Sequence, residues 1–188
     1  MLDVTVGLKE LNHVSEIHII AINNEVKELL WLLDKEFDGS PAIKTINFNK
    51  KDTITFDFNF TDEAITQYSL PKIYLYEPNA AIMKSGGFNL ISNRFRIDKL
   101  HKHSHLYTSE DLINFPGRCF RIIRTIPYHK KDVKSYLLKR KANITTRNFT
   151  ENVSSLKKRW KISDGGMDYL FFTTLENNEK VILVCVKV

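Results

Sequence analysis

The sequence of 188 residues has little glycine, proline or cysteine, with seven, five and two residues respectively. So little glycine and proline excludes a collagen-like repeat or a low-complexity linker. Two cysteines are too few for a disulfide scaffold. Cys119 and Cys185 each lie among apolar residues, so we expect reduced core thiols, with a disulfide or redox pair as the alternative.

Segments that would direct the chain to a membrane are also missing. No run reaches the ~20 apolar residues of a membrane-spanning helix. The first residues lack the charged and apolar regions of a signal peptide. We therefore expect a cytoplasmic protein that does not enter a membrane.

Familiar catalytic and cofactor motifs are absent as well. There is no G-x-S-x-G motif, and Gly86-Gly87 and Gly165-Gly166 are isolated pairs that form neither a P-loop nor a G-x-G-x-x-G motif. Hydrophobic residues make up 43% and charged residues 27% of the chain, as in ordinary globular proteins. The sequence thus predicts a globular module, and whether this chain is itself an enzyme stays open.

Basic residues are scarce in the first part of the chain and abundant later. Residues 1–70 carry 6 basic and 12 acidic side chains, whereas residues 71–188 carry 22 basic and 10 acidic ones. Within residues 84–161 the balance is 19 basic to 5 acidic. The inversion near residue 70 predicts two units, 1–70 and 71–188, with different partners.

The pattern of the first unit indicates strands with a short helix before them. Residues 16–22 and 25–34 are expected to form a hairpin that turns at Asn23-Asn24, although the leucines and glutamates of the second segment also fit a helix. Alternating apolar residues predict strands at 44–48 and 53–60.

In the second unit, helices and strands are mixed. Asn79 is a predicted N-cap of a helix reaching about Arg94, with a close backbone contact at its glycine pair. Further helices are expected over 129–142 and after Thr150 or Asn152, followed by a hairpin of residues 169–175 and 180–188. The mixture predicts an α+β fold with helices packed on largely antiparallel sheets.

Three histidines, His101, His103 and His105, alternate along the chain and on a strand would share one face. Three imidazoles could hold zinc. However, no carboxylate lies closer in sequence than Asp98 or Glu110, and the neighbouring lysines oppose a cation. We therefore expect a packed polar loop or basic surface and no metal site.

Clustered basic residues are the stronger signal, because each contact with a phosphate releases counterions and adds affinity. A single basic run is commonly only a solvated helix face, but four such groups lie in the second half of the chain. The predicted nucleic-acid contacts are Arg94, Arg96, Lys99, Lys102, Arg140, Arg147, Lys157, Lys158 and Arg159.

Several stretches resemble a known family. Residues 74–82 (YLYEPNAAI), 104–109 (SHLYTS), 115–118 (FPGR), 142–149 (ANITTRNF) and 165–187 are similar to the THUMP-like domain at the C-terminus of a group of bacterial class I S-adenosylmethionine-dependent methyltransferases. Residues 1–70 resemble the small ferredoxin-like domain that precedes it, most clearly around the hairpin at residues 23–28.

This resemblance implies a ferredoxin-like α/β sandwich over 1–70 and a THUMP-like α+β domain over 71–188. It also implies that the catalytic domain, which would bind S-adenosylmethionine, precedes this chain. THUMP domains proper bind structured RNA, so the resemblance implies an accessory region that recognises tRNA or rRNA for methylation. The alternative is a structural or protein-interaction module that completes the methyltransferase fold without binding nucleic acid.

Overall fold

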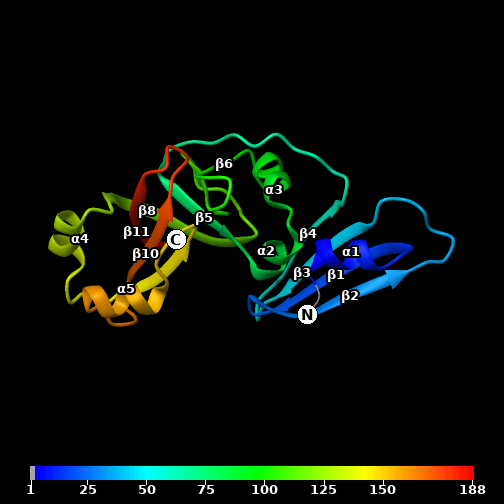
Figure 1. Ribbon diagram of the computed structural model, residues 1–188, viewed down its shortest axis with the longest axis horizontal. Coiled ribbons are helices and arrows are strands. Elements are labelled where there is room, and N and C mark those ends of the chain that lie inside the picture. The colour runs from blue at the N-terminus through cyan, green and yellow to red at the C-terminus, as the bar shows by residue number, and fades with distance from the viewer. Residues whose placement is uncertain (1–2) are drawn as a thin grey trace. The chain divides into compact units, whose positions relative to one another are not determined.

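A computed structural model describes residues 3–188 and divides the chain into two compact units. The first comprises residues up to 65 together with 78–94, and the second comprises residues 66–77 together with 95–188. Each unit has its own sheet (Figure 1). Residues 78–94, which follow the first strand of the second sheet, thus complete the first unit.

The first unit is a four-stranded sheet with short helices. The strands β1 (Val14–Ile22), β2 (Glu25–Leu33), β3 (Ala42–Phe48) and β4 (Thr53–Asn59) lie in the order β2-β1-β3-β4, and β1 runs parallel to β3. The predicted hairpin is confirmed, because β1 and β2 pair antiparallel and both Asn23 and Asn24 have positive φ. Helix α1 (Val4–Glu10) begins at Asp3, whose side chain accepts from Thr5 N.

The helix expected from Asn79 to Arg94 is broken into two. Asn79 caps α2 (Ala80–Ser85) as predicted, but Gly86 is left-handed with φ 80° and ends this helix before α3 (Phe88–Phe95) begins. The expected close approach is confirmed at Gly87, where an added Cβ would lie 2.8 Å from the Phe58 ring. This break lets α2 pack on β1 and β3, with Ala81 in the core of the first unit.

The second unit contains a seven-stranded sheet in the order β6-β7-β5-β8-β11-β10-β9. Strands β8, β11 and β10 pair antiparallel, and β9 lies parallel to β10 at the edge. The predicted closing hairpin is confirmed by the register of β10 and β11. The strands are β5 (Tyr74–Pro78), β6 (Asp98–Lys99), β7 (Tyr107–Ser109), β8 (Gly117–Pro127), β9 (Asn143–Arg147), β10 (Asp168–Thr174) and β11 (Lys180–Lys187).

Helices α4 (Lys130–Leu137) and α5 (Val153–Trp160) bury their apolar sides against this sheet. Val133 and Leu137 of α4 join Leu156 and Trp160 of α5 in one core cluster. The helix expected over 129–142 is shorter, because the chain leaves the helical path after Leu137. Asn152 supplies the cap of α5 by accepting from Ser155 N.

A second cluster of apolar residues in this unit includes Phe120, Phe171 and Cys185. Cys119 and Cys185 are both free thiols, as expected, and burial raises the pKa of each. The two mixed, mostly antiparallel sheets with packed helices confirm the predicted α+β class. Among residues 3–188, no helix combines the length and apolar character needed to cross a membrane.

Candidate nucleic-acid interface

Two basic runs that are separate in sequence lie side by side in the second unit. Lys139 N donates to Trp160 O at 3.1 Å, and Ser163 N donates to Arg140 O at 3.0 Å. Ala142 N then donates to Ser163 O at 2.9 Å. These bonds tie the segment after α4 to the end of α5, so residues 139–141 and 157–161 form one surface, which we call the basic surface.

Local backbone geometry makes this junction possible. Lys161, which caps the end of α5, and Lys139, which follows the α4 cap Leu138, have left-handed φ of 54° and 62°, so the chain changes direction sharply after each helix. Gly166 has φ 82°, and an added Cβ would lie 3.0 Å from Lys141 O. A glycine is therefore required where the chain passes Lys141.

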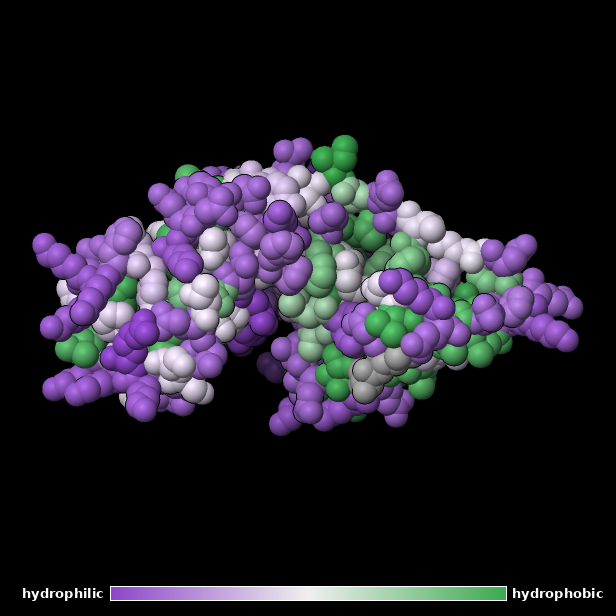
Figure 2. All heavy atoms as spheres, viewed as in Figure 1, coloured by the Kyte–Doolittle hydropathy of each residue, from purple (hydrophilic) through white to green (hydrophobic). Residues whose placement is uncertain are grey.

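Four lysines of the basic surface are exposed: Lys139, Lys141, Lys158 and Lys161. Within residues 3–188, no carboxylate lies within ion-pair distance of their ammonium groups. Hydrophilic side chains project from the surface over α4, α5 and their connections (Figure 2). This surface therefore offers uncompensated positive charge to a polyanion.

The other cations of the basic surface are paired. Arg140 donates to Asp168 at 2.7 Å, and its guanidinium lies 4.0 Å from the centre of the Tyr136 ring. Lys157 pairs with Asp164 at 2.5 Å. Arg159 donates to Glu151 at 2.9 Å. These three predicted contacts lie where a nucleic acid could reach them, but their charge is already balanced.

Arg147, another predicted contact, is held by a buried carboxylate. Glu77, whose side chain is 4% exposed, accepts from Arg147 Nε at 2.9 Å and from Arg118 Nε at 2.7 Å. Arg118 Nη2 also contacts Glu77. One buried acid thus orders two guanidinium groups, each about a third exposed. Sequence reasoning missed Glu77, because its partners lie 41 and 70 residues away.

The group predicted around residues 94–102 is divided between the two units, and one of its members is buried. Arg94 belongs to the first unit, where it donates to Asp57 O at 2.7 Å and covers the Phe56 ring. Arg96 and Lys102 are exposed in the second unit. Lys99 is 2% exposed, donates to Lys102 O at 3.0 Å, and has a pKa lowered to about 8 by burial. Its ammonium is therefore not presented to solvent as a phosphate contact.

The sequence predicted a packed polar loop or a basic surface around the three histidines, and the structure places them in a loop where His101 is buried, His105 is partly buried and His103 is exposed. His101 is 7% exposed, and its Nδ1 accepts from His103 N at 3.0 Å and contacts Asn148 at 2.9 Å. Burial lowers the pKa of His101, and it lowers the pKa of His105 to about 4. In the described chain, no three His, Cys, Asp or Glu side chains are grouped in a way that could hold a metal ion.

Two family models match consecutive segments of the chain. Residues 74–116 match the family model of a ferredoxin-like domain, and residues 117–187 match that of a THUMP-like domain. The sequence predicted a ferredoxin-like domain over residues 1–70 and a THUMP-like domain over residues 71–188. The matched THUMP-like segment contains all of the basic surface and the sheet edge that carries Arg147.

A solved structure from Porphyromonas gingivalis W83, described as a "putative methyltransferase", is similar to the whole chain, with 34% sequence identity and a TM-score of 0.89. The match covers 100% of this chain and 49% of that chain. A search of the curated proteins found no match. The chain thus contains ferredoxin-like and THUMP-like segments and spans about half the length of the protein it resembles.

Proposed function

We propose that this chain is the accessory, RNA-binding region of an S-adenosylmethionine-dependent methyltransferase that modifies tRNA or rRNA. The observation that carries the proposal is the junction of residues 139–141 with residues 157–161, which gathers four exposed lysines within the segment similar to a THUMP-like domain. The similarity to the structure described as a "putative methyltransferase" supports the enzymatic context.

The proposal depends on the way in which cationic side chains bind the phosphate backbone of RNA. Lysine ammonium groups that are not paired with carboxylates can displace condensed counterions from RNA, and the released ions make binding favourable. Arg140, Lys157 and Arg159 can add contacts by exchanging their carboxylate partners for phosphate oxygens, at the cost of breaking those pairs. We therefore assign the main contacts to Lys139, Lys141, Lys158 and Lys161.

S-adenosylmethionine would be held by a part of the enzyme outside these 188 residues. Gly87 faces the Phe58 ring, and Gly166 lies against the backbone of Lys141. Both glycine pairs therefore have structural reasons that do not involve a nucleotide. The methyl donor would supply the transferred group, and this chain would hold the RNA for that reaction.

The test is RNA binding by a variant from which three of these lysines are removed. We expect Lys139→Ala, Lys158→Ala and Lys161→Ala together to lower the affinity for a labelled tRNA transcript by at least tenfold at low salt. The control, Lys9→Ala with Lys50→Ala and Lys51→Ala, removes the same charge from exposed positions of the first unit. Equal losses in both variants, or no binding by the unchanged chain to tRNA and rRNA fragments, would contradict the proposal.

A protein-interaction role has one specific observation in its favour. In the first sheet, Ile22 and Phe48 lie opposite each other and are each 45% exposed, and Leu30 and Leu32 alternate on the neighbouring strand with 43% and 41% exposure. This half-apolar sheet face is suited to contact with another protein domain. If RNA does not bind, the alternative proposal is that this face docks on the catalytic domain.

A further inference from the structure

A pocket of about 580 Å³ opens beside the basic surface. Its lining comes from three elements of the second unit: Tyr128 follows β8, Lys130 and Val133 belong to α4, and Arg159 and Trp160 belong to α5. A volume of this size suits a ligand as large as a single nucleotide.

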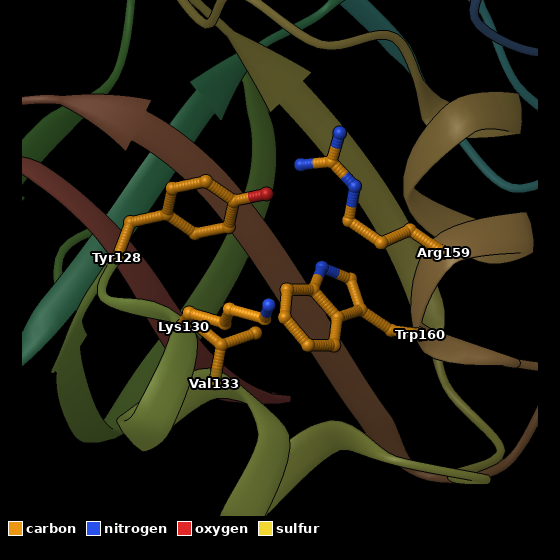
Figure 3. A pocket seen from close by; sticks show the side chains of 5 residues that line it. All are labelled: Tyr128, Lys130, Val133, Arg159 and Trp160. Carbon is orange, nitrogen blue, oxygen red and sulfur yellow. The ribbon is translucent and has the colours of Figure 1, made fainter.

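Polar groups of four side chains converge on this space. Figure 3 shows the Tyr128 hydroxyl, the Arg159 guanidinium, the Lys130 ammonium and the indole nitrogen of Trp160 directed toward one another across the pocket. The pocket therefore combines two aromatic rings with two cations. This combination matches a planar base attached to a phosphate.

The indole of Trp160 supplies an unused hydrogen-bond donor. The residue is 7% exposed. Its N–H faces the space beside the Tyr128 hydroxyl (Figure 3), yet among residues 3–188 no acceptor lies in hydrogen-bonding geometry to it. A buried donor without a partner costs free energy, which an incoming acceptor recovers.

Glu151 positions two of these groups. Its Oε1 accepts from the Tyr128 O–H at 2.7 Å and from Arg159 Nη1 at 2.9 Å. The Tyr128 ring is held further by Phe149 and Phe172, at centroid distances of 4.9 and 5.9 Å. The ring and the guanidinium are thus ordered before any ligand arrives. Lys130 and Arg159 together outweigh the single charge of Glu151.

We propose that this pocket binds one unstacked nucleotide of the bound RNA. Its base contacts the rings of Tyr128 and Trp160, and an acceptor on the base edge takes the indole N–H. Its phosphate contacts Lys130 and Arg159. That the nucleotide belongs to a bound RNA rests on the proposed function. The affinity of the pocket for a nucleotide does not depend on that function.

The first experiment measures the fluorescence of Trp160 in the 188-residue chain. Trp31→Phe leaves Trp160 as the single tryptophan, because the sequence has two. We expect adenosine 5′-monophosphate to quench its fluorescence saturably, adenosine to do so about tenfold more weakly, and inorganic phosphate alone not to quench. Absence of quenching by the mononucleotide, or equal potency of inorganic phosphate, would overturn the proposal.

Variants in the same background locate the contacts. Lys130→Ala should weaken binding of the mononucleotide about fivefold. Glu151→Gln, whose amide oxygen can still accept from Tyr128 and Arg159, should strengthen it about threefold by removing a negative charge near the phosphate. Lys134→Ala is the matched control, because Lys134 is exposed on the same helix but does not line the pocket. If Lys130→Ala and Lys134→Ala bind the mononucleotide equally, the pocket is not its site.

Measurements with two RNA hairpins distinguish a failure of the pocket proposal from a failure of the proposed function. An RNA hairpin with a single-stranded end should quench Trp160, and a blunt hairpin should bind with little quenching. Binding of both hairpins without quenching would overturn the pocket proposal and leave RNA binding intact. Quenching by the mononucleotide without binding of either hairpin would assign the pocket to a free nucleotide and overturn RNA as its source.

Discussion

Arg147 Nη2 lies 2.7 Å from Glu77 Oε1, although the two residues are 70 positions apart in the chain. Arg147 ends β9, the edge strand of the second sheet, and Glu77 lies near the end of β5 in the same sheet. Arg118 of β8 completes the cluster by donating to the other carboxylate oxygen of Glu77. This carboxylate therefore connects three strands of the second unit.

Removing the charge of Glu77 should destabilise the second unit. Loss of one partner from a buried ion pair costs about 3–5 kcal/mol, but both guanidinium groups are partly exposed and can be rehydrated. We therefore expect about 2 kcal/mol for Glu77→Ala and about 1 kcal/mol for Glu77→Gln, measured by urea unfolding. Glu179→Gln, at an exposed turn position, is the control and should change stability by less than about 0.5 kcal/mol.

Acid should destabilise the second unit through His105. Burial, followed by the positive charges of Lys99 and Arg147, lowers the pKa of His105 to about 4, below the ordinary value of 6.5. The unfolded chain therefore binds more protons between these values, and stability falls as the pH is lowered from 6.5 toward 4.

Replacement of His105 by asparagine separates this effect from other titrations. His105 has a left-handed φ of 52°, which asparagine also tolerates. Since His105 is partly exposed, we expect His105→Asn to reduce the loss of stability between pH 6.5 and 4 by about 1–2 kcal/mol. Unfolding curves of the two proteins that fall in parallel across this range would rule out this role of His105.

The two glycines between α2 and α3, Gly86 and Gly87, should be required for different reasons. Gly87→Ala places a methyl group against the Phe58 ring, so we expect a loss of about 1–2 kcal/mol in the stability of the first unit. Gly86 has open space around its Cβ position but a left-handed φ of 80°. Gly86→Asn should therefore be tolerated better than Gly87→Ala in thermal unfolding, and the reverse order would contradict this assignment.

Local sequence signals predicted much of the fold. The Asn23-Asn24 turn, the Asn79 cap and the closing hairpin depend on neighbouring residues, and all three were predicted. The ends of α4 and of α2 were not, because the backbone leaves the helical conformation at Leu138, with ψ 122°, and becomes left-handed at Gly86. A leucine does not indicate the end of a helix, and a glycine pair also occurs inside continuous helices.

The candidate site was harder to predict because it depends on contacts between distant segments. Basic runs at 139–141 and 157–159 were visible in the sequence, but not the backbone bonds that join them. The contacts predicted from the sequence did not include Lys139, Lys141 or Lys161, and nothing in the sequence showed that Lys99 is buried or that Glu77 holds Arg147. Counting like charges finds the basic segments, whereas the pairing of each charge requires the fold.

The most direct test of the central claim is the salt dependence of RNA binding. The affinity for a tRNA transcript should be measured by fluorescence anisotropy between about 50 mM and about 200 mM salt, for the unchanged chain and for the variant lacking Lys139, Lys158 and Lys161. Removal of three phosphate contacts should reduce the slope of log affinity against log salt by about two to three. A slope unchanged in that variant, and equal to that of the Lys9, Lys50 and Lys51 control, would contradict RNA binding through the basic surface.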